Sequence, residues 1–452
     1  MPAGFVAGGA SAGIKASGRP DLAVVASAAA APGVGDDGQG SAARRRPRVA
    51  AAAVFTPNRL AAAPVLVSRR HLLATEPGGG GRYGWATGIV STSGCANAAT
   101  GAAGLADQER VARWLAEHLG AEPETILTLS TGIIGTRLPL DRVEGGLAEL
   151  VPGLRADDEG LAAAARALMT TDSRPKWATA TLTLPDPDGL AARAVRVTGI
   201  AKGVGMIHPR MATMLAVLLT DATVEPAALA GLLRPIVART WNQLTIDGDT
   251  STNDTVFLLA SGAAGTIQVR PGTAEAAALR RAVEAVARDL ARQQAADGEG
   301  ATTLITCQVS GAADDAEARA VARAVVASSL VKAAVHGRDP NWGRIAAAAG
   351  NALLPEAVVL EAAGLPTAEA ERRAGRPAGV DPDRLRIAIA GQLVFDGSAG
   401  GPQPFDREAA RAAMGGPECL IRLDLGLGSG VGEAFGCDLS EEYVVENSEY
   451  TT

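Results

Sequence analysis

Hydrophobic and polar positions alternate along several short stretches of this chain, and this alternation predicts β-strands. The predicted strands are Val49–Phe55, Trp177–Leu184, Ala194–Ile200, Thr302–Val309, Leu385–Val394 and Leu420–Leu427. A continuous apolar run, Met214–Leu219, is typical of a fully buried strand.

Apolar residues recur at intervals of three and four in other stretches, which predicts amphipathic helices. These helices are Leu105–Leu119, Glu159–Met169, Pro226–Trp241, Ala274–Ala296 and Asp315–Ser328. Strands and helices alternate without a regular strand–helix–strand order, so a layered α/β or α+β fold is favoured over a doubly wound parallel sheet. Glycine- or proline-rich stretches are expected to be loop insertions, namely Gly33–Arg48, Gly78–Gly81 and Pro366–Asp383.

Composition narrows the class of protein. The net charge of −7 over 452 residues argues against a nucleic-acid partner, because phosphate neutralisation dominates such binding. No stretch approaches the ~20 apolar residues of a membrane span, and the N-terminus lacks the pattern of a signal peptide. The four cysteines show no metal-ligand spacing, so free thiols in a reducing cytoplasm are expected.

Motifs for phosphate or metal ligands are incomplete. The tetraglycine at Gly78–Gly81 is not followed by Lys-Ser/Thr, and Gly203-Val204-Gly205 lacks the third glycine of a dinucleotide fingerprint. The acidic stretch Asp247–Asp254 lacks the spaced glycine and terminal glutamate of an EF-hand. We therefore expect no metal and no cofactor, and we interpret the acidic stretch as a hydrogen-bonded turn that shapes a site.

The segment AKGVGMIHPRMATMLAVLLTDA, residues 201–222, carries the candidate chemistry. Glycines allow unusual backbone angles and Pro209 restrains the chain beside them, a combination that can hold one peptide bond in a strained turn. Attack by the Thr213 hydroxyl on the Ala212–Thr213 bond, followed by hydrolysis, would leave Thr213 as a new N-terminus. Its α-amine, with a reference pKa of about 7.7–8.0, would then serve as general base for its own hydroxyl. Pattern alone nevertheless favours a loop entering a core strand.

Blocks along the whole chain resemble one family. They are GFVAGGASAGIKASGRPDLA, VFTPNRLAAAPV, SGCANAATG, STGIIG, MTTDSRPK, KGVGMIHPRMATML, IDGDTSTNDTV, DGEGATTLI, SLVKAAVHGRDPNWGRI and DLSEEYVVENSEYTT. Their sequence and order are similar to those of the bifunctional ornithine acetyltransferase/glutamate N-acetyltransferase family of arginine biosynthesis. The resemblance implies sheets sandwiched between helical layers, as in related self-processing aminopeptidases.

The resemblance also implies maturation by cleavage at Ala212–Thr213. The two products, residues 1–212 and 213–452, are expected to stay associated, usually as a tetramer of two of each. The implied reaction moves an acetyl group from N2-acetyl-L-ornithine to L-glutamate through an ester on Thr213. Some family members also accept acetyl-CoA, and the sequence leaves that second activity open.

Site residues follow from the positions that match the family motifs. Thr213 matches the nucleophile, and Thr131 and Gly132 match the oxyanion hole. The implied substrate contacts are Thr170, Lys202, Thr213, Glu299, Asn447 and Thr452. Thr171 is an alternative to Thr170. Without the resemblance, these residues would be interpreted as an ordinary turn, a solvated lysine, a helix-end carboxylate and a polar tail.

Other interpretations of the chain remain. Water in place of glutamate would make it an amidohydrolase or aminopeptidase, and a copy recruited to secondary metabolism would have relaxed specificity. A third alternative is an unprocessed, non-catalytic scaffold. His208, five residues before Thr213, is not assigned as a base, because the α-amine supplies one and no carboxylate is placed to orient the imidazole.

Overall fold

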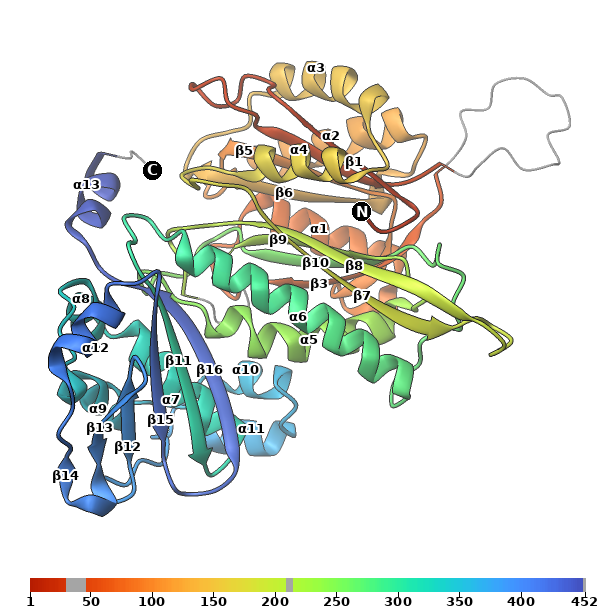
Figure 1. The fold of residues 1–452 in the computed structure, drawn as a ribbon. Helices are drawn as coiled ribbons and strands as arrows, with labels where there is room; N and C mark the ends of the chain where they lie inside the picture. Colours follow the sequence, from red (N-terminus) through yellow and green to blue (C-terminus); the bar gives the residue numbers. More distant parts are fainter. Residues whose placement is uncertain (30–45, 209–213, 450–452) are drawn as a thin grey trace, which may run out of the picture.

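The computed structural model describes residues 1–29, 46–208 and 214–449, which form three β-sheets with helices against them (Figure 1). The first sheet has the order β1 (Phe5–Ala10), β2 (Leu22–Ser27), β5 (Gly88–Cys95) and β6 (Ile126–Ile133). The second has the order β4 (Tyr83–Ala86), β3 (Val49–Phe55), β10 (Thr255–Ala260), β9 (Leu215–Thr220), β8 (Ala192–Lys202) and β7 (Lys176–Pro185). Both sheets contain parallel and antiparallel pairs.

These two sheets pack face to face and are enclosed by helices. Phe5 and Leu127 of the first sheet share a buried core with Val217 and Phe257 of the second. Apolar faces of α2 (Gly101–Leu119) and α3 (Leu140–Leu150) cover the first sheet, whereas α5 (Pro226–Arg239) and α6 (Ala274–Ala296) cover the second. Helices α1 (Ala63–Thr75) and α4 (Asp158–Leu168) add Leu72 and Leu161 to the core between the sheets. The predicted arrangement of sheets between helical layers is confirmed.

The third sheet has its own core. Its order is β14 (Gly401–Pro402), β13 (Gln392–Asp396), β12 (Arg386–Ile389), β15 (Glu418–Asp424), β11 (Leu304–Ala312) and β16 (Gly430–Cys437). Around it lie α7 (Asp315–Ala327), α8 (Ser329–His336), α9 (Trp342–Gly350), α10 (Ala357–Ala362), α11 (Thr367–Arg373) and α12 (Arg407–Met414). After β16, α13 (Glu441–Glu449) runs back toward the first two sheets (Figure 1). Short 3-10 turns occur at Pro77–Gly79, Pro123–Thr125, Val151–Gly153, Trp241–Gln243 and Gly397–Ala399.

Local signals explain why the strongest predictions agree with the structure. Helix α6 has the predicted bounds, and the Thr273 hydroxyl accepts a hydrogen bond from the amide of Ala276 at its start. The Asp314 carboxylate caps α7 in the same way, through the amides of Ala316 and Glu317. The apolar run after residue 213 forms β9, which is buried throughout.

Two predictions about local structure are wrong. Leu385–Val394 was expected to be one strand, but it contains β12 and the start of β13, joined by a turn at Ala390 and Gly391 with positive φ angles of 48° and 87°. The expected loop Pro366–Asp383 contains α11, because Pro366 precedes a run of good helix formers. The insertion Gly33–Arg48 lies almost entirely outside the described residues. The tetraglycine forms part of a 3-10 turn and the bend after it.

The second sheet joins segments from both sides of residue 212. Strand β8 pairs antiparallel with β9 from Val197–Thr220 to Lys202–Leu215, and β10 pairs with β3. The N-terminal and C-terminal parts of the chain are therefore interleaved in one sheet. Within the described ranges, no helix combines the length and apolar character that crossing a bilayer requires.

Candidate active site

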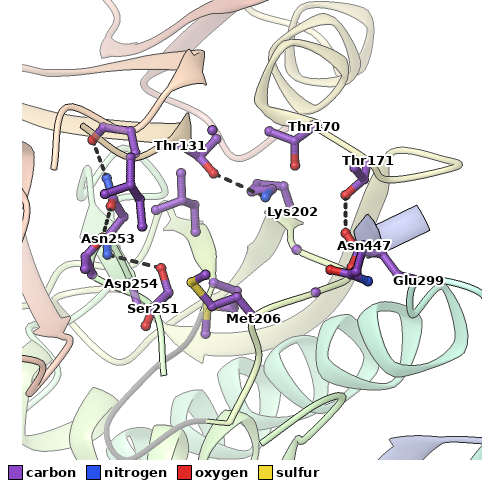
Figure 2. Close-up of a pocket in the computed structure, with 18 residues that line it drawn as sticks. Thr131, Thr170, Thr171, Lys202, Met206, Ser251, Asn253, Asp254, Glu299 and Asn447 are labelled. Carbon is purple, nitrogen blue, oxygen red and sulfur yellow. Dashed lines mark hydrogen bonds between the residues drawn. The ribbon is translucent and has the colours of Figure 1, made fainter. Parts of the chain in front are cut away.

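The predicted site residues that fall within the described ranges gather around one pocket (Figure 2). It lies where β6 and β8 end, where β9 begins, and beside the loops that follow α4 and α6. Of the predicted residues, the pocket is lined by Thr131, Gly132, Thr170, Lys202, Glu299 and Asn447, and also by the alternative Thr171. The fold thus brings together residues that are more than 300 positions apart in the sequence.

The predicted cleavage residues Ala212 and Thr213, and the tail residue Thr452, lie outside the described residues. The chain immediately after them is described. Met214 and Leu215 line the same pocket, and the amide of Thr255 donates to the carbonyl of Met214 at 2.8 Å. The start of β9 therefore forms part of the pocket wall.

The end of β6 provides the predicted oxyanion-hole residues. Gly132 has a φ of 124°, and a Cβ there would lie 2.4 Å from the carbonyl carbon of Gly94, so a larger residue cannot adopt this backbone without displacement. The Thr131 hydroxyl oxygen accepts a hydrogen bond from Lys202 Nζ at 3.3 Å. Because a hydroxyl has one donor as well as two acceptor positions, Thr131 keeps a proton to donate into the pocket.

Lys202, at the end of β8, is buried and its side chain is 8% exposed. Burial lowers the pKa of this ammonium group, while the nearby carboxylates of Asp172 and Glu299 oppose the shift. The amide of Gln294 donates to the Lys202 carbonyl at 2.8 Å and fixes the strand end. Lys202 is thus an amine held in a fixed position beside the predicted oxyanion hole.

A buried ion cluster supports this corner of the pocket. Lys176 Nζ lies 2.7 Å from Asp172 Oδ1 and 2.6 Å from Asp297 Oδ2, and these side chains are at most 4% exposed. Asp172 also accepts from the amides of Thr170 at 3.0 Å and Gly203 at 2.9 Å. Burial alone would raise the pKa of Asp172, but Lys202, Lys176 and these hydrogen bonds together lower it to about 2. The cluster joins the Thr170 loop to the start of β7 and to the end of α6.

Glu299 lies beside the Thr170 loop and is held by two side chains (Figure 2). The Thr171 hydroxyl donates to Glu299 Oε1 at 2.8 Å, and Asn447 Nδ2 donates to Glu299 Oε2 at 3.0 Å. A Cβ on Gly205 would lie 2.1 Å from Glu299 Oε2, so the carboxylate passes directly over this glycine. A carboxylate fixed in this way can bind the amine of a substrate. Of the two threonines, Thr171 makes the direct contact with it.

The N-terminal segment supports the Thr170 loop from outside the pocket. Lys15 Nζ donates to the carbonyl of Met169 at 2.5 Å, and Arg19 donates to the carbonyl of Thr170 at 2.9 Å. Burial, with Arg19 nearby, lowers the pKa of Lys15 to about 8. Lys15 and Arg19 lie in the block GFVAGGASAGIKASGRPDLA, for which the sequence alone predicts no role.

The acidic turn before β10 contributes a residue that sequence reasoning did not assign. Asn253 Nδ2 donates to the carbonyls of Ala96 at 2.6 Å and Ser130 at 2.8 Å, which joins this turn to the end of β6. Asp254 lines the pocket, is 2% exposed, and its Oδ2 has no hydrogen-bond partner among the described residues. Burial raises the pKa of this carboxyl well above its ordinary value, although Lys202 and the Ser251 and Thr56 side chains oppose the shift.

His208 faces away from this site. Its Nδ1 lies 2.9 Å from the hydroxyl of Thr245, and it lines a separate cavity between α5, α7 and α10. Within the described ranges, no group of three or more His, Cys, Asp and Glu side chains could hold a metal ion. The four cysteines are buried and unpaired.

Known proteins with similar sequences cover the whole chain. The sequence profile of the ArgJ family matches residues 6–452. The arginine biosynthesis bifunctional protein ArgJ of Thermus thermophilus is 43% identical over 100% of this chain and 99% of its own length. The corresponding protein of Deinococcus radiodurans is 42% identical over 100% of this chain and 98% of its own length. The chloroplastic protein of Citrullus lanatus is 40% identical over 99% of this chain and 87% of its own length.

Solved structures of similar sequence cover about half of the chain. ArgJ of Bacillus halodurans is 38% identical, with a TM-score of 0.44, over 51% of this chain and 96% of the solved chain. An ornithine acetyltransferase of Mycobacterium tuberculosis, solved in complex with ornithine, is 33% identical with a TM-score of 0.34. It covers 47% of this chain and 94% of its own.

Proposed function

Because this chain belongs to the ArgJ family, its activity is acetyl transfer in arginine biosynthesis, and we propose that the transfer passes through an ester on Thr213. In this proposal the chain is cut at Ala212–Thr213, and Thr213 then takes the acetyl group of N2-acetyl-L-ornithine and passes it to L-glutamate. One observation carries the assignment of the site. The described residues predicted for oxyanion and substrate binding line one pocket, whose wall includes the first residues after Thr213.

The proposed reaction has two balanced halves. The Thr213 hydroxyl attacks the acetyl carbonyl while its α-amine takes the hydroxyl proton, and Thr131 and Gly132 stabilise the oxyanion. The proton passes to the nitrogen of ornithine as the amide C–N bond breaks, which leaves acetyl-Thr213. The neutral amine of glutamate then attacks the ester, its proton returns to the Thr213 oxygen, and N-acetylglutamate leaves.

The sheet pairing supports continued association of the two products. A cut between residues 212 and 213 would leave β9 and β10 hydrogen-bonded between strands β8 and β3 of the first product. Separating them would expose the apolar core between the sheets, which is strongly unfavourable in water. We therefore propose that the mature enzyme contains both products, and from the family resemblance we propose that they form a tetramer of two of each.

Initial-rate kinetics test the covalent intermediate. Varying N2-acetylornithine at several glutamate concentrations is expected to give parallel double-reciprocal lines, because ornithine leaves before glutamate reacts. Intersecting lines would contradict an acetyl-enzyme. Measuring free acetate in the same assay separates transfer to glutamate from transfer to water, and replacing acetylornithine with acetyl-CoA tests the second activity.

Thr131→Ala is expected to lower kcat about 10²- to 10³-fold with a much smaller change in KM. The hydroxyl acts on the oxyanion rather than on the bound substrate, and loss of one such donor typically raises the barrier by about 2.7–4 kcal/mol. Steady-state assays of Thr131→Ala beside Thr183→Ala, an exposed threonine of β7, provide the measurement and its control. A change confined to KM would assign Thr131 to substrate binding instead.

Glu299→Gln is expected to raise the KM for N2-acetylornithine roughly 10- to 100-fold, since hydrogen bonds to charged groups contribute about 1.5–3 kcal/mol. The amide keeps the size of the side chain and removes the charge that pairs with a substrate amine. Glu408→Gln, at an exposed position in the first turn of α12, is the matched control. An unchanged KM would show that the substrate amine binds elsewhere.

A further inference from the structure

A buried carboxylate, Asp438, lies at the junction between β16 and α13. It is 2% exposed and accepts hydrogen bonds from the Thr302 amide at 2.8 Å, the Thr302 hydroxyl at 2.6 Å and the Thr303 amide at 2.9 Å. His336 Nδ1 approaches its second oxygen at 2.8 Å. Burial alone would raise the pKa of Asp438, but the bonds from Thr302 and His336 outweigh it and lower the pKa. Asp438 is therefore an ionised hub.

The two segments that meet at this hub carry residues of the pocket. Thr302 follows Glu299 closely in the loop after α6, and α13 begins just after Asp438 and carries Asn447. The loop and the helix start are in direct contact, because the Ser440 hydroxyl donates to the Gly300 carbonyl at 2.6 Å. A Cβ on Gly300, where φ is 64°, would lie 2.3 Å from the Tyr443 amide nitrogen. This packing places α13 so that the Asn447 side chain donates its hydrogen bond to Glu299.

His336 reaches the hub from the last turn of α8, outside the pocket, and its side chain is 31% exposed. Its Nε2 lies 3.4 Å from a carboxylate oxygen of Glu441, the first residue of α13. The imidazole thus lies between two carboxylates, one buried and one exposed. The Nδ1 side of the ring can donate to Asp438, while the Nε2 side faces Glu441.

Two other charged side chains belong to α8 or to the residues just after it. Lys332, one turn earlier on α8, is buried and its ammonium group donates to the Cys437 carbonyl. Arg338, exposed just after α8, lines the same pocket as His336, together with Thr302, Thr303 and Gly415. Asp438 and Glu441 are therefore the carboxylates that the His336 imidazole contacts.

We propose that His336 is a positioning residue for the substrate-amine site: by binding Asp438 and Glu441 together, it holds the start of α13 and the Glu299 loop so that Asn447 stays on Glu299. This inference rests on the proposed function, in which Glu299 binds the amine of the substrate. His336 touches no substrate, so it acts on substrate binding and leaves the acetyl-transfer step and the maturation cut unchanged.

The test compares His336→Ala with His336→Asn in the full-length, matured enzyme. The asparagine amide can replace the Nδ1 donor to Asp438 but cannot reach Glu441. We expect His336→Ala to raise the KM for N2-acetylornithine about tenfold with kcat within twofold, and His336→Asn to restore most of the loss. His118→Ala, an exposed histidine in the last turn of α2, is the control.

Amide hydrogen exchange gives a second measurement that does not depend on catalysis. His336→Ala is expected to raise exchange several-fold in residues 441–449 and 298–303, with β5 unchanged. Unaltered exchange and KM would overturn the proposal, and so would a fall in kcat alone or an asparagine variant no better than alanine. If His336→Ala exchanged faster but the wild-type protein made no N-acetylglutamate, the anchoring role would stand and the proposed function would be rejected.

Discussion

Thr213→Ala is expected to leave the chain as one uncut polypeptide and to lower kcat by roughly 10⁴-fold or more, the scale seen when an enzyme loses its nucleophile. Alanine has no hydroxyl to attack the Ala212 carbonyl, so no ester forms and no α-amine is released. The same substitution removes the proposed acceptor of the acetyl group. Intact mass spectrometry of the purified protein reports the cut, and N-acetylglutamate formation reports the transfer.

Thr213→Ser is the matched control, because it keeps a hydroxyl at the same position. It is expected to mature into chains of residues 1–212 and 213–452 and to retain measurable transfer. Far-ultraviolet circular dichroism of the alanine variant should match that of the wild type. Cleavage of the alanine variant at the same bond, or full transfer by an uncut chain, would reject Thr213 as the nucleophile.

The elements that the sequence predicted well are those whose signals are local. Helix α6 carries its own N-cap, and β9 is a run of apolar residues, so neither depends on distant contacts for its recognition. The hairpin of β12 and β13 was missed because its turn places Ala390 at positive φ, which alanine rarely adopts. Gly391 was the one local signal that could have divided the predicted strand.

The site shows what local sequence patterns cannot predict. Motif resemblance named Thr131, Lys202, Glu299 and Asn447, and the fold brings them to one pocket. No periodicity or spacing could have joined them, because their proximity is created by strand order. Asp254 went unassigned for a related reason: a carboxyl in a polar turn is normally solvated, and only its burial in the fold raises its pKa.

Asp172 and Lys176 lie in the motif MTTDSRPK, but the sequence predicts no role for them. Their structural importance follows from their burial. Lys176→Met is expected to destabilise the first two sheets by about 3–5 kcal/mol, the usual cost of removing one partner from a buried ion pair. The substitution leaves the carboxylates of Asp172 and Asp297 facing each other without their shared cation. Urea unfolding at neutral pH, followed on the full-length protein, measures the loss.

The destabilisation caused by Lys176→Met is expected to depend on pH with a defined sign. The pKa of Asp172 is depressed to about 2 in the folded protein, below the ordinary value of about 3.9, so its stabilisation is complete above the ordinary pKa. That stabilisation fades as the pH falls toward 2. The difference between wild type and Lys176→Met should therefore be largest at neutral pH and shrink on acidification below about 4. A difference that grows on acidification would contradict this account.

Arg155→Met provides the matched control for a surface ion pair. Arg155 pairs with Asp157 and Glu159, and all three side chains are largely exposed, so its loss should change unfolding little at any pH. A loss equal to that of Lys176→Met would show that burial is not the cause. The buried cluster of Lys176, Asp172 and Asp297 also fixes the Thr170 loop, and Asp297 lies just after α6, two residues before Glu299. The fraction of Lys176→Met that remains folded should therefore also show a raised KM for N2-acetylornithine. Lys176 stabilises the fold and also positions the segments that carry the predicted substrate contacts.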